Sequence, residues 1–124
     1  MDFTRSEAEV EVSSLAAQVI AAHSGDAARP RATDFDTGLW KDLGQAGLLS
    51  LALPAELGGD ELGVQATAAV LTEVGRHAAR IPALATLALG VLPVAKSADI
   101  ALKEQLLAGV ASGETVLTAA IREP

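Results

Sequence analysis

The sequence predicts an all-α fold of about five helices. Half of the residues are apolar, but Phe3, Phe35 and Trp40 are the only aromatic ones, so the core must be built from Leu, Val, Ile and Ala. Such side chains favour closely packed helices. The apolar residues also recur mostly at steps of three and four, the period of an α-helix. A length of 124 residues suits one domain with a single core.

The first helix is predicted over residues 5–23. Thr4 and Glu7 have the spacing of a capping box at its start. Its apolar side consists of Ala8, Val12, Leu15, Ala16, Val19 and Ile20. His23 falls in the last turn, where a positive charge favours the helix dipole. Ser24-Gly25 should end the helix, and residues 26–33 are predicted to form a polar connection.

A second, shorter helix is predicted between Asp36 and Gly47. Asp36 is a suitable N-cap, and Phe35 and Trp40 have the spacing of a hydrophobic staple around it. Residues 48–54 are apolar without helical period, so we expect them to cross the surface in extended form. Residues 55–60 should then form a turn.

Three more helices are predicted after this turn. One runs from Gly63 to Ala78, and the next begins at Pro82 and is apolar on every side, which is typical of an element surrounded by protein. Its apolar residues fit either plain core or the wall of a cavity, and periodicity favours core. The last helix is capped by Asp99 and ends at Gly113. The inward faces are predicted as Val64, Thr67, Ala68, Leu71, Val74 and Gly75, and as Leu102, Leu106, Leu107 and Val110.

Residues 115–121 have the composition of a β-strand, but the sequence contains no sheet for it to join. We therefore expect one helical domain over 1–114. Residues 115–124 would be the start of a second domain, cut off at the boundary.

Composition excludes several classes of function. A net charge of −7 with scattered basic residues argues against nucleic-acid binding. Cysteine is absent, which removes thiolate catalysis and sulfur-ligated metals. The N-terminus has no signal-peptide pattern, and the longest apolar stretch, 81–95, is too short to span a bilayer. These features predict a cytoplasmic protein.

The sequence offers little direct evidence of catalysis. Glu73 and His77 lie four residues apart, but without further ligands an ion pair in solvent beside Arg76 is the expected arrangement. The glycines of segment 58–63 lack the lysine of a phosphate loop and predict a turn with positive φ angles. No Ser/His/Asp arrangement is apparent. We therefore assign no catalytic and no metal-binding residue.

Six segments, in order along nearly the whole chain, resemble acyl-CoA dehydrogenases. They are Leu39–Leu48, Leu53–Gly59, Leu71–Arg76, Leu89–Pro93, Lys103–Gly113 and Ala119–Pro124. The resemblance implies the N-terminal helical domain of that family, followed by the first strand of its β domain. A complete enzyme would bind FAD and remove hydrogens from the α and β carbons of an acyl-CoA thioester. Its catalytic base would lie in the C-terminal helical domain.

The same resemblance implies site residues. Ala85 and Leu89 correspond to positions facing the acyl tail, although ordinary helix packing explains them equally well. Ala119, Ile121 and Arg122 correspond to cofactor contacts. Arg122 departs from the threonine usual in the family, which suggests a heteromeric dehydrogenase whose partner subunit carries the complete flavin site.

The expected partners are the acyl-CoA thioester, the β and C-terminal helical domains, and other subunits in a homo- or hetero-oligomer. Alternatives are a non-catalytic helical interaction module, a flavin-less subunit, and a flavin-dependent monooxygenase on the same fold.

Overall fold

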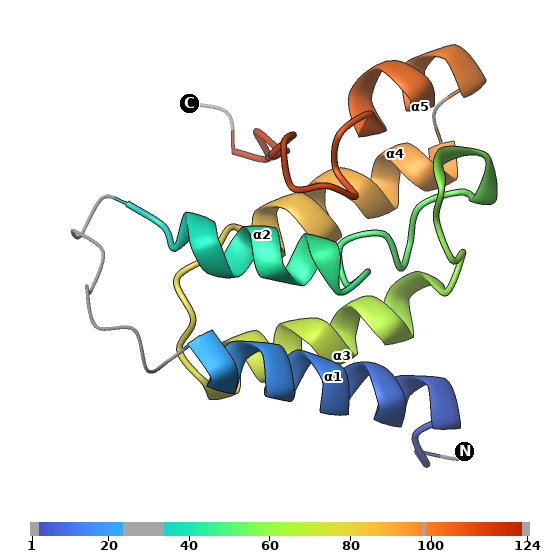
Figure 1. Cartoon of the computed structure of the whole chain (residues 1–124). Helices are drawn as coiled ribbons and strands as arrows, with labels where there is room; N and C mark the ends of the chain where they lie inside the picture. Colours follow the sequence, from blue (N-terminus) through green and yellow to red (C-terminus); the bar gives the residue numbers. More distant parts are fainter. Residues whose placement is uncertain (1–2, 24–33, 98, 123–124) are drawn as a thin grey trace.

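The structure, a computed structural model, describes residues 3–23, 34–97 and 99–122. It confirms the helical fold. The elements in chain order are α1 (Glu7–His23), α2 (Thr37–Gln45), the 3₁₀ turn η1 (Ala55–Leu57), α3 (Gly63–Arg76), the π-helix η2 (Leu84–Val91), α4 (Leu92–Ser97) and α5 (Ile100–Leu107). In Figure 1, α1 and α3 lie side by side and α5 lies on the opposite side of the molecule. The predicted helix end and connection at 24–33 lie outside the described residues.

The start of α1 corrects one prediction. The capping box is formed by Ser6 and Glu9, not by Thr4 and Glu7. The Glu9 amide donates to Ser6 Oγ at 3.2 Å, and the Ser6 amide donates to Glu9 Oε2 at 2.7 Å. These reciprocal bonds occupy amide donors that the helix itself leaves free. The bond from the Ser6 amide also favours the charged carboxylate, so it lowers the pKa of Glu9.

The second helix begins and ends as predicted. The Asp36 side chain accepts a hydrogen bond from the Leu39 amide at 2.9 Å. Gly47 ends the helix with a φ of 78°. The amide of Leu48 then bonds the carbonyl of Leu43 at 3.0 Å, which completes a C-terminal cap of the Schellman type.

The main core lies between α1, α2, α3 and the start of η2. Ala16, Ile20, Leu43 and Val70 are at most 2 % exposed. The remaining buried members of this cluster are Val12, Leu39, Trp40, Leu48, Leu49, Leu51, Ala66, Ala69, Ala83 and Leu87. Leu15, predicted to face the core, is 38 % exposed.

Segment 48–54 does not cross the surface in extended form. It is a series of bends and turns. Leu48, Leu49, Leu51 and Leu53 are all buried, because the turns direct them into the two cores. The Gly-Gly turn folds back onto this segment, where the Leu62 amide bonds the Leu51 carbonyl at 2.7 Å. A Cβ atom added to Gly59 would overlap the Leu53 carbonyl oxygen, so only glycine fits there. The predicted positive φ angles are confirmed at Gly58 and Gly63.

The inward face of α3 was predicted wrongly in part. Thr67 is buried as expected, but Val64 is 61 % exposed, and Ala68 and Gly75 are exposed too. The buried side consists of Ala66, Thr67, Ala69, Val70 and Glu73. Because α1 packs along this side, the helix is rotated relative to the face that apolar residues alone indicated.

The last helices pack around a second, smaller core of Leu53, Val91, Leu107 and Val110. Asp99 caps α5 as predicted, accepting from the Leu102 amide at 2.8 Å. However, α5 ends at Leu107 rather than at Gly113, and Leu102 is 42 % exposed rather than inward. Turns at Gly109 and Gly113, both with φ near 80°, then reverse the chain.

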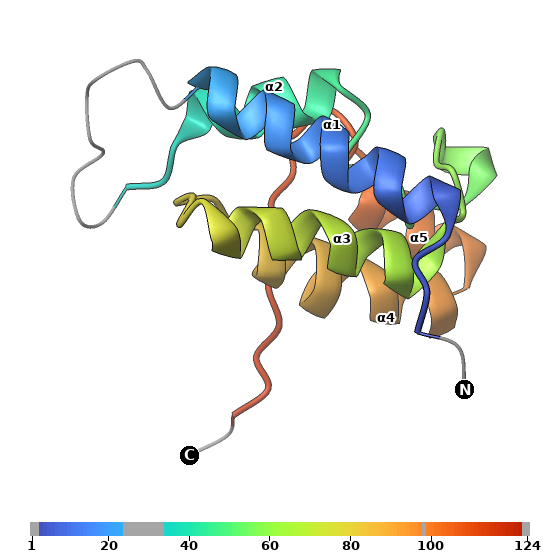
Figure 2. The same cartoon turned by 90° about the horizontal axis from the view of Figure 1, so that it is seen from below.

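Residues 115–122 form an extended segment, which leaves the helical body in Figure 2. No β-strand is present among the described residues, so the strand predicted at 115–121 is not formed in this chain. Burial nevertheless alternates along it, with Thr115, Leu117 and Ala119 half-buried and the residues between them exposed. This period of two is that of a strand without a partner.

Candidate functional site

The helix η2 has one open apolar side. Hydrogen bonds in a π-helix join residues five apart, so residues four and five apart lie on the same side. Leu84 is 60 % and Leu89 36 % exposed, and Ala85 and Ala88 are half-buried beside them. The opposite side, with Thr86, Leu87, Gly90 and Val91, is buried. The expectation that this helix is surrounded by protein is therefore wrong for the described residues.

The extended segment is fixed to the buried side of the same helix. Thr86 Oγ1 donates to the Leu117 carbonyl at 3.0 Å and accepts from the Leu117 amide at 3.2 Å. Leu117 also lies directly over Gly90, where an added Cβ would be 2.5 Å from the Leu117 Cβ. The hydroxyl of Thr86 thus satisfies both backbone groups of one residue, as a neighbouring strand would.

These contacts place the residues that the sequence singled out. Ala85 and Leu89 lie on the open side of η2 and precede Thr86 and Gly90 directly. Ala119 is half-buried two residues after Leu117, whereas Ile121 is 78 % exposed and Arg122 is exposed. The residues predicted to face the acyl tail and those predicted to contact the cofactor therefore belong to two elements that are hydrogen-bonded to each other.

Sequence reasoning missed Thr86, Gly90, Leu84 and Ala88. A signal for two of them was present. Thr86 and Gly90 lie four apart in a run that is otherwise aliphatic apart from its two prolines. A threonine buried in such a run needs a hydrogen-bond partner, and a helical glycine there indicates close approach of another segment.

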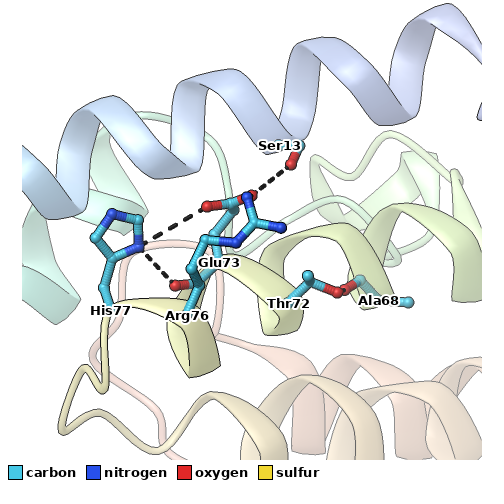
Figure 3. A network of polar contacts seen from close by, with 6 residues as sticks. All are labelled: Ser13, Ala68, Thr72, Glu73, Arg76 and His77. Carbon is cyan, nitrogen blue, oxygen red and sulfur yellow. Dashed lines mark hydrogen bonds and ion pairs between the residues drawn. The ribbon is translucent and has the colours of Figure 1, made fainter.

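Figure 3 shows the polar contacts of Glu73 with Ser13 and His77. The ion pair expected beside Arg76 is present, at 3.1 Å, but the carboxylate is not in solvent, because Glu73 is only 2 % exposed. Its Oε1 accepts from Ser13 Oγ of α1 at 2.8 Å and from Arg76 Nη1 at 3.1 Å. Its Oε2 is buried and has no hydrogen-bond partner, with His77 Nδ1 3.8 Å away. This carboxylate ties α3 to α1.

The two ring nitrogens of His23 each face a carboxylate. Nδ1 lies 3.0 Å from Asp42 Oδ2, and Nε2 lies 3.0 Å from Asp36 Oδ1. Burial by itself lowers the pKa of His23, but the hydrogen bond to Asp42 and the charge of Asp36 outweigh it, so the pKa is raised above 6.5. A protonated imidazole donates from both nitrogens, which joins the end of α1 to the N-cap of α2. This role is structural.

A separate groove of about 640 Å³ lies between α2 and residues 112–114. Phe35, Trp40 and Gly113 line it. The Trp40 Nε1 donor is buried without a hydrogen-bond partner. The charged residues of its lining are Lys41 and Glu114, both of which are exposed. Among the described residues, no three His, Cys, Asp or Glu side chains gather as a metal site.

Fold and site together define a helical domain with one open apolar helix face and an extended C-terminal segment attached to it. Residues 5–114 match the family model described as "Acyl-CoA dehydrogenase, N-terminal domain". The chain belongs to the acyl-CoA dehydrogenase family, a family of oxidoreductases, and comprises its N-terminal domain.

Two curated relatives come from Mycobacterium tuberculosis. Acyl-CoA dehydrogenase FadE28 is 51 % identical over 85 residues, which cover 68 % of this chain and 25 % of that protein. Acyl-CoA dehydrogenase FadE27 is 32 % identical over 98 % of this chain and 34 % of its own length. The chain thus spans about a quarter to a third of these relatives.

Two solved structures are similar as well. One is titled a steroid ACAD variant of Tcur3481-Tcur3483, with a TM-score of 0.82 and 38 % identity over 94 % of this chain and 33 % of that one. The other is the ChsE4-ChsE5 complex from Mycobacterium tuberculosis, with a TM-score of 0.81 and 32 % identity over the whole chain and 36 % of that one.

Within the part of the chain that the structure describes, no helix is both long and apolar enough to cross a bilayer.

Proposed function

We propose that this chain is the acyl-binding helical domain of a flavin-dependent dehydrogenase that introduces a double bond between the α and β carbons of an acyl-CoA thioester. The observation that carries the proposal is the open apolar side of η2, where Leu84, Ala85, Ala88 and Leu89 remain accessible. A hydrocarbon tail needs a wall of this kind, because burying apolar surface is the main source of its binding energy.

The described residues fit one edge of a flavin site. In segment 119–122, the backbone is extended and has no strand beside it. Its amide and carbonyl groups, with the exposed side chains of Ile121 and Arg122, would contact FAD. When bound, FAD supplies the hydride acceptor for the reaction. This chain contributes the walls that orient the acyl group, and the base that removes the α proton comes from outside it.

We further propose that the working enzyme contains more than one kind of subunit. Arg122 occupies the position where the family usually has threonine. Both similar solved structures also carry paired protein names, Tcur3481-Tcur3483 and ChsE4-ChsE5. A long cationic side chain in place of a small hydroxyl changes both the charge and the hydrogen-bonding groups at this edge of the flavin site. A partner subunit would then carry the complete flavin site.

The substitution Ala85→Phe tests the acyl wall in the protein that carries this chain. The larger side chain should shorten the cavity, so catalytic efficiency should fall for long or polycyclic acyl-CoA substrates and stay near wild type for short ones. Ala68→Phe, at an exposed position of α3, is the matched control. It should leave catalytic efficiency unchanged for both long and short substrates.

The alternative result is equally clear. If Ala85 only packs in a core, phenylalanine overpacks the helix and lowers stability by about 1–3 kcal/mol. All substrate lengths would then lose efficiency equally and the melting temperature would drop, which would reject the pocket assignment.

A non-catalytic subunit is the second candidate, favoured by Arg122. Absorbance of the purified protein, alone and mixed with candidate partner subunits, distinguishes the two functions. A protein that binds flavin only with a partner, and through the partner's residues, would support the second.

A further inference from the structure

We propose that Thr86 and Gly90 are positioning residues that hold segment 115–122 in register against the buried side of η2, the helix whose open side forms the acyl wall. The inference rests on the proposed function, in which segment 115–122 carries the predicted flavin contacts and the open side of η2 carries the predicted acyl contacts. Neither residue faces the open side of η2, and both are buried. Their effect on the reaction would therefore act through the residues that they hold in place.

The contact is specific to one register. Thr86 is fully buried, and its hydroxyl bonds both the carbonyl and the amide of Leu117 at 3.0 and 3.2 Å. Gly90 leaves room for the Leu117 side chain, which packs against the second core. Thr115, two residues earlier, is held by its amide at 3.0 Å from the Gly109 carbonyl. A slip by one residue would place Val116 or Thr118 over Gly90 and break all of these contacts.

The holding residues alternate with the wall residues along one short helix. Ala85 and Leu89 each directly precede a residue that holds Leu117. An extended chain rises about 3.3 Å per residue, so Ala119 follows roughly 7 Å and Ile121 roughly 13 Å beyond the anchor. The helix η2 therefore fixes how far the cofactor-side residues lie from the acyl-side ones. That spacing matters because a misplacement of about 1 Å at a reacting centre costs up to about a hundredfold in rate.

The test uses the protein that carries this chain, with Thr86→Val, Thr86→Ser and Gly90→Ala. Valine keeps the shape of threonine but removes both hydrogen bonds, serine restores the hydroxyl, and the alanine methyl pushes Leu117 away. Thr72→Val is the matched control, because Thr72 Oγ1 also bonds a backbone carbonyl, at 2.7 Å, but within its own helix.

The first readout is hydrogen exchange of the Leu117 amide, measured without substrate. Exchange should be about tenfold faster in Thr86→Val and Gly90→Ala, and near wild type in Thr86→Ser and Thr72→Val. The second is flavin reduction by an acyl-CoA in single turnover. Its rate should fall by about ten- to a hundredfold in Thr86→Val and Gly90→Ala, while the acyl-CoA dissociation constant stays within about twofold.

Unchanged exchange in a folded Thr86→Val protein would overturn the anchor itself. Faster exchange with an unchanged reduction rate would leave a structural contact and overturn the positioning role. If Thr86→Val does not fold, Gly90→Ala tests the same contact, because its methyl group displaces the Leu117 side chain. A wild-type protein that neither binds flavin nor oxidises any acyl-CoA, alone or with its partner subunit, would refute the proposed function. The exchange comparison would still decide whether the anchor exists.

Discussion

Replacing Ser13 with alanine should destabilise the domain more than any exposed serine substitution. Ser13 Oγ donates to Glu73 Oε1 at 2.8 Å, and Glu73 is only 2 % exposed. Arg76 is the other hydrogen-bond donor, but its side chain is 62 % exposed and screened by solvent. Oε2 already has no hydrogen-bond partner. Removing the Ser13 hydroxyl therefore leaves a buried charged group with little compensation.

The expected cost is about 1.5–3 kcal/mol, the usual worth of a hydrogen bond to a charged group. Urea unfolding followed by far-UV circular dichroism measures it at constant pH. Ser112→Ala is the control, because Ser112 is exposed and bonds only the nearby Gly109 carbonyl. The control should change stability by less than about 0.5 kcal/mol.

A double-mutant cycle with Glu73→Gln separates the pair from its surroundings. In the glutamine background the hydrogen bond is neutral, so Ser13→Ala should cost only about 0.5–1.5 kcal/mol. Equal costs in both backgrounds, or a cost below about 0.5 kcal/mol with Glu73 intact, would show that the carboxylate does not depend on Ser13. That result would refute the account of how α1 is held to α3.

Three further predictions concern His23, Gly59 and flavin binding. Because the folded-state pKa of His23 is raised above 6.5, its contribution to stability is complete below about pH 6.5 and is lost as pH rises through the folded value. His23→Gln should therefore flatten the fall in unfolding free energy as the pH rises above about 6.5. A fall of equal size in the variant would assign the effect elsewhere. Gly59→Ala should cost about 1–3 kcal/mol in urea unfolding because its methyl group meets the Leu53 carbonyl. Gly75→Ala, in open space within α3, should instead stabilise the domain by about 0.5–1 kcal/mol. Equal changes in unfolding free energy for the two glycine variants would contradict the packing argument. The 124-residue chain alone, mixed with FAD and an acyl-CoA, should form no flavoprotein that bleaches, because the proposed function places the base and most flavin contacts outside it. Stoichiometric yellow protein that bleaches with substrate would disprove this.

Much of the fold could be predicted from local signals. Asp36 and Asp99 were recognised as caps because an aspartate before an apolar run satisfies helix amides through its own side chain. Gly47 was recognised as an end because its positive φ is needed for the cap. These features depend only on residues within one or two turns, which a single sequence displays fully.

The predictions that failed depend on distant partners. The burial of Glu73 requires Ser13, which is 60 residues away in the sequence, and nothing near either residue indicates the pairing. The inward face of α3 was assigned by counting apolar residues. However, α1 packs against a side on which the small residues Ala66 and Ala69 permit close approach and Thr67 and Glu73 are polar. Periodicity identified the helix but could not orient it.

The helix η2 shows which kind of residue does carry orientation in an apolar run. Aliphatic side chains fit either side equally well, so Leu84 and Leu87 are indistinguishable by sequence, although the first is 60 % and the second 5 % exposed. Thr86 and Gly90 are different, because a hydroxyl must find a partner and a missing side chain leaves space for one. Both lie on the side that meets Leu117. The side with no such exceptions is the one left open, as expected if its partner is an acyl chain, which offers no hydrogen bonds.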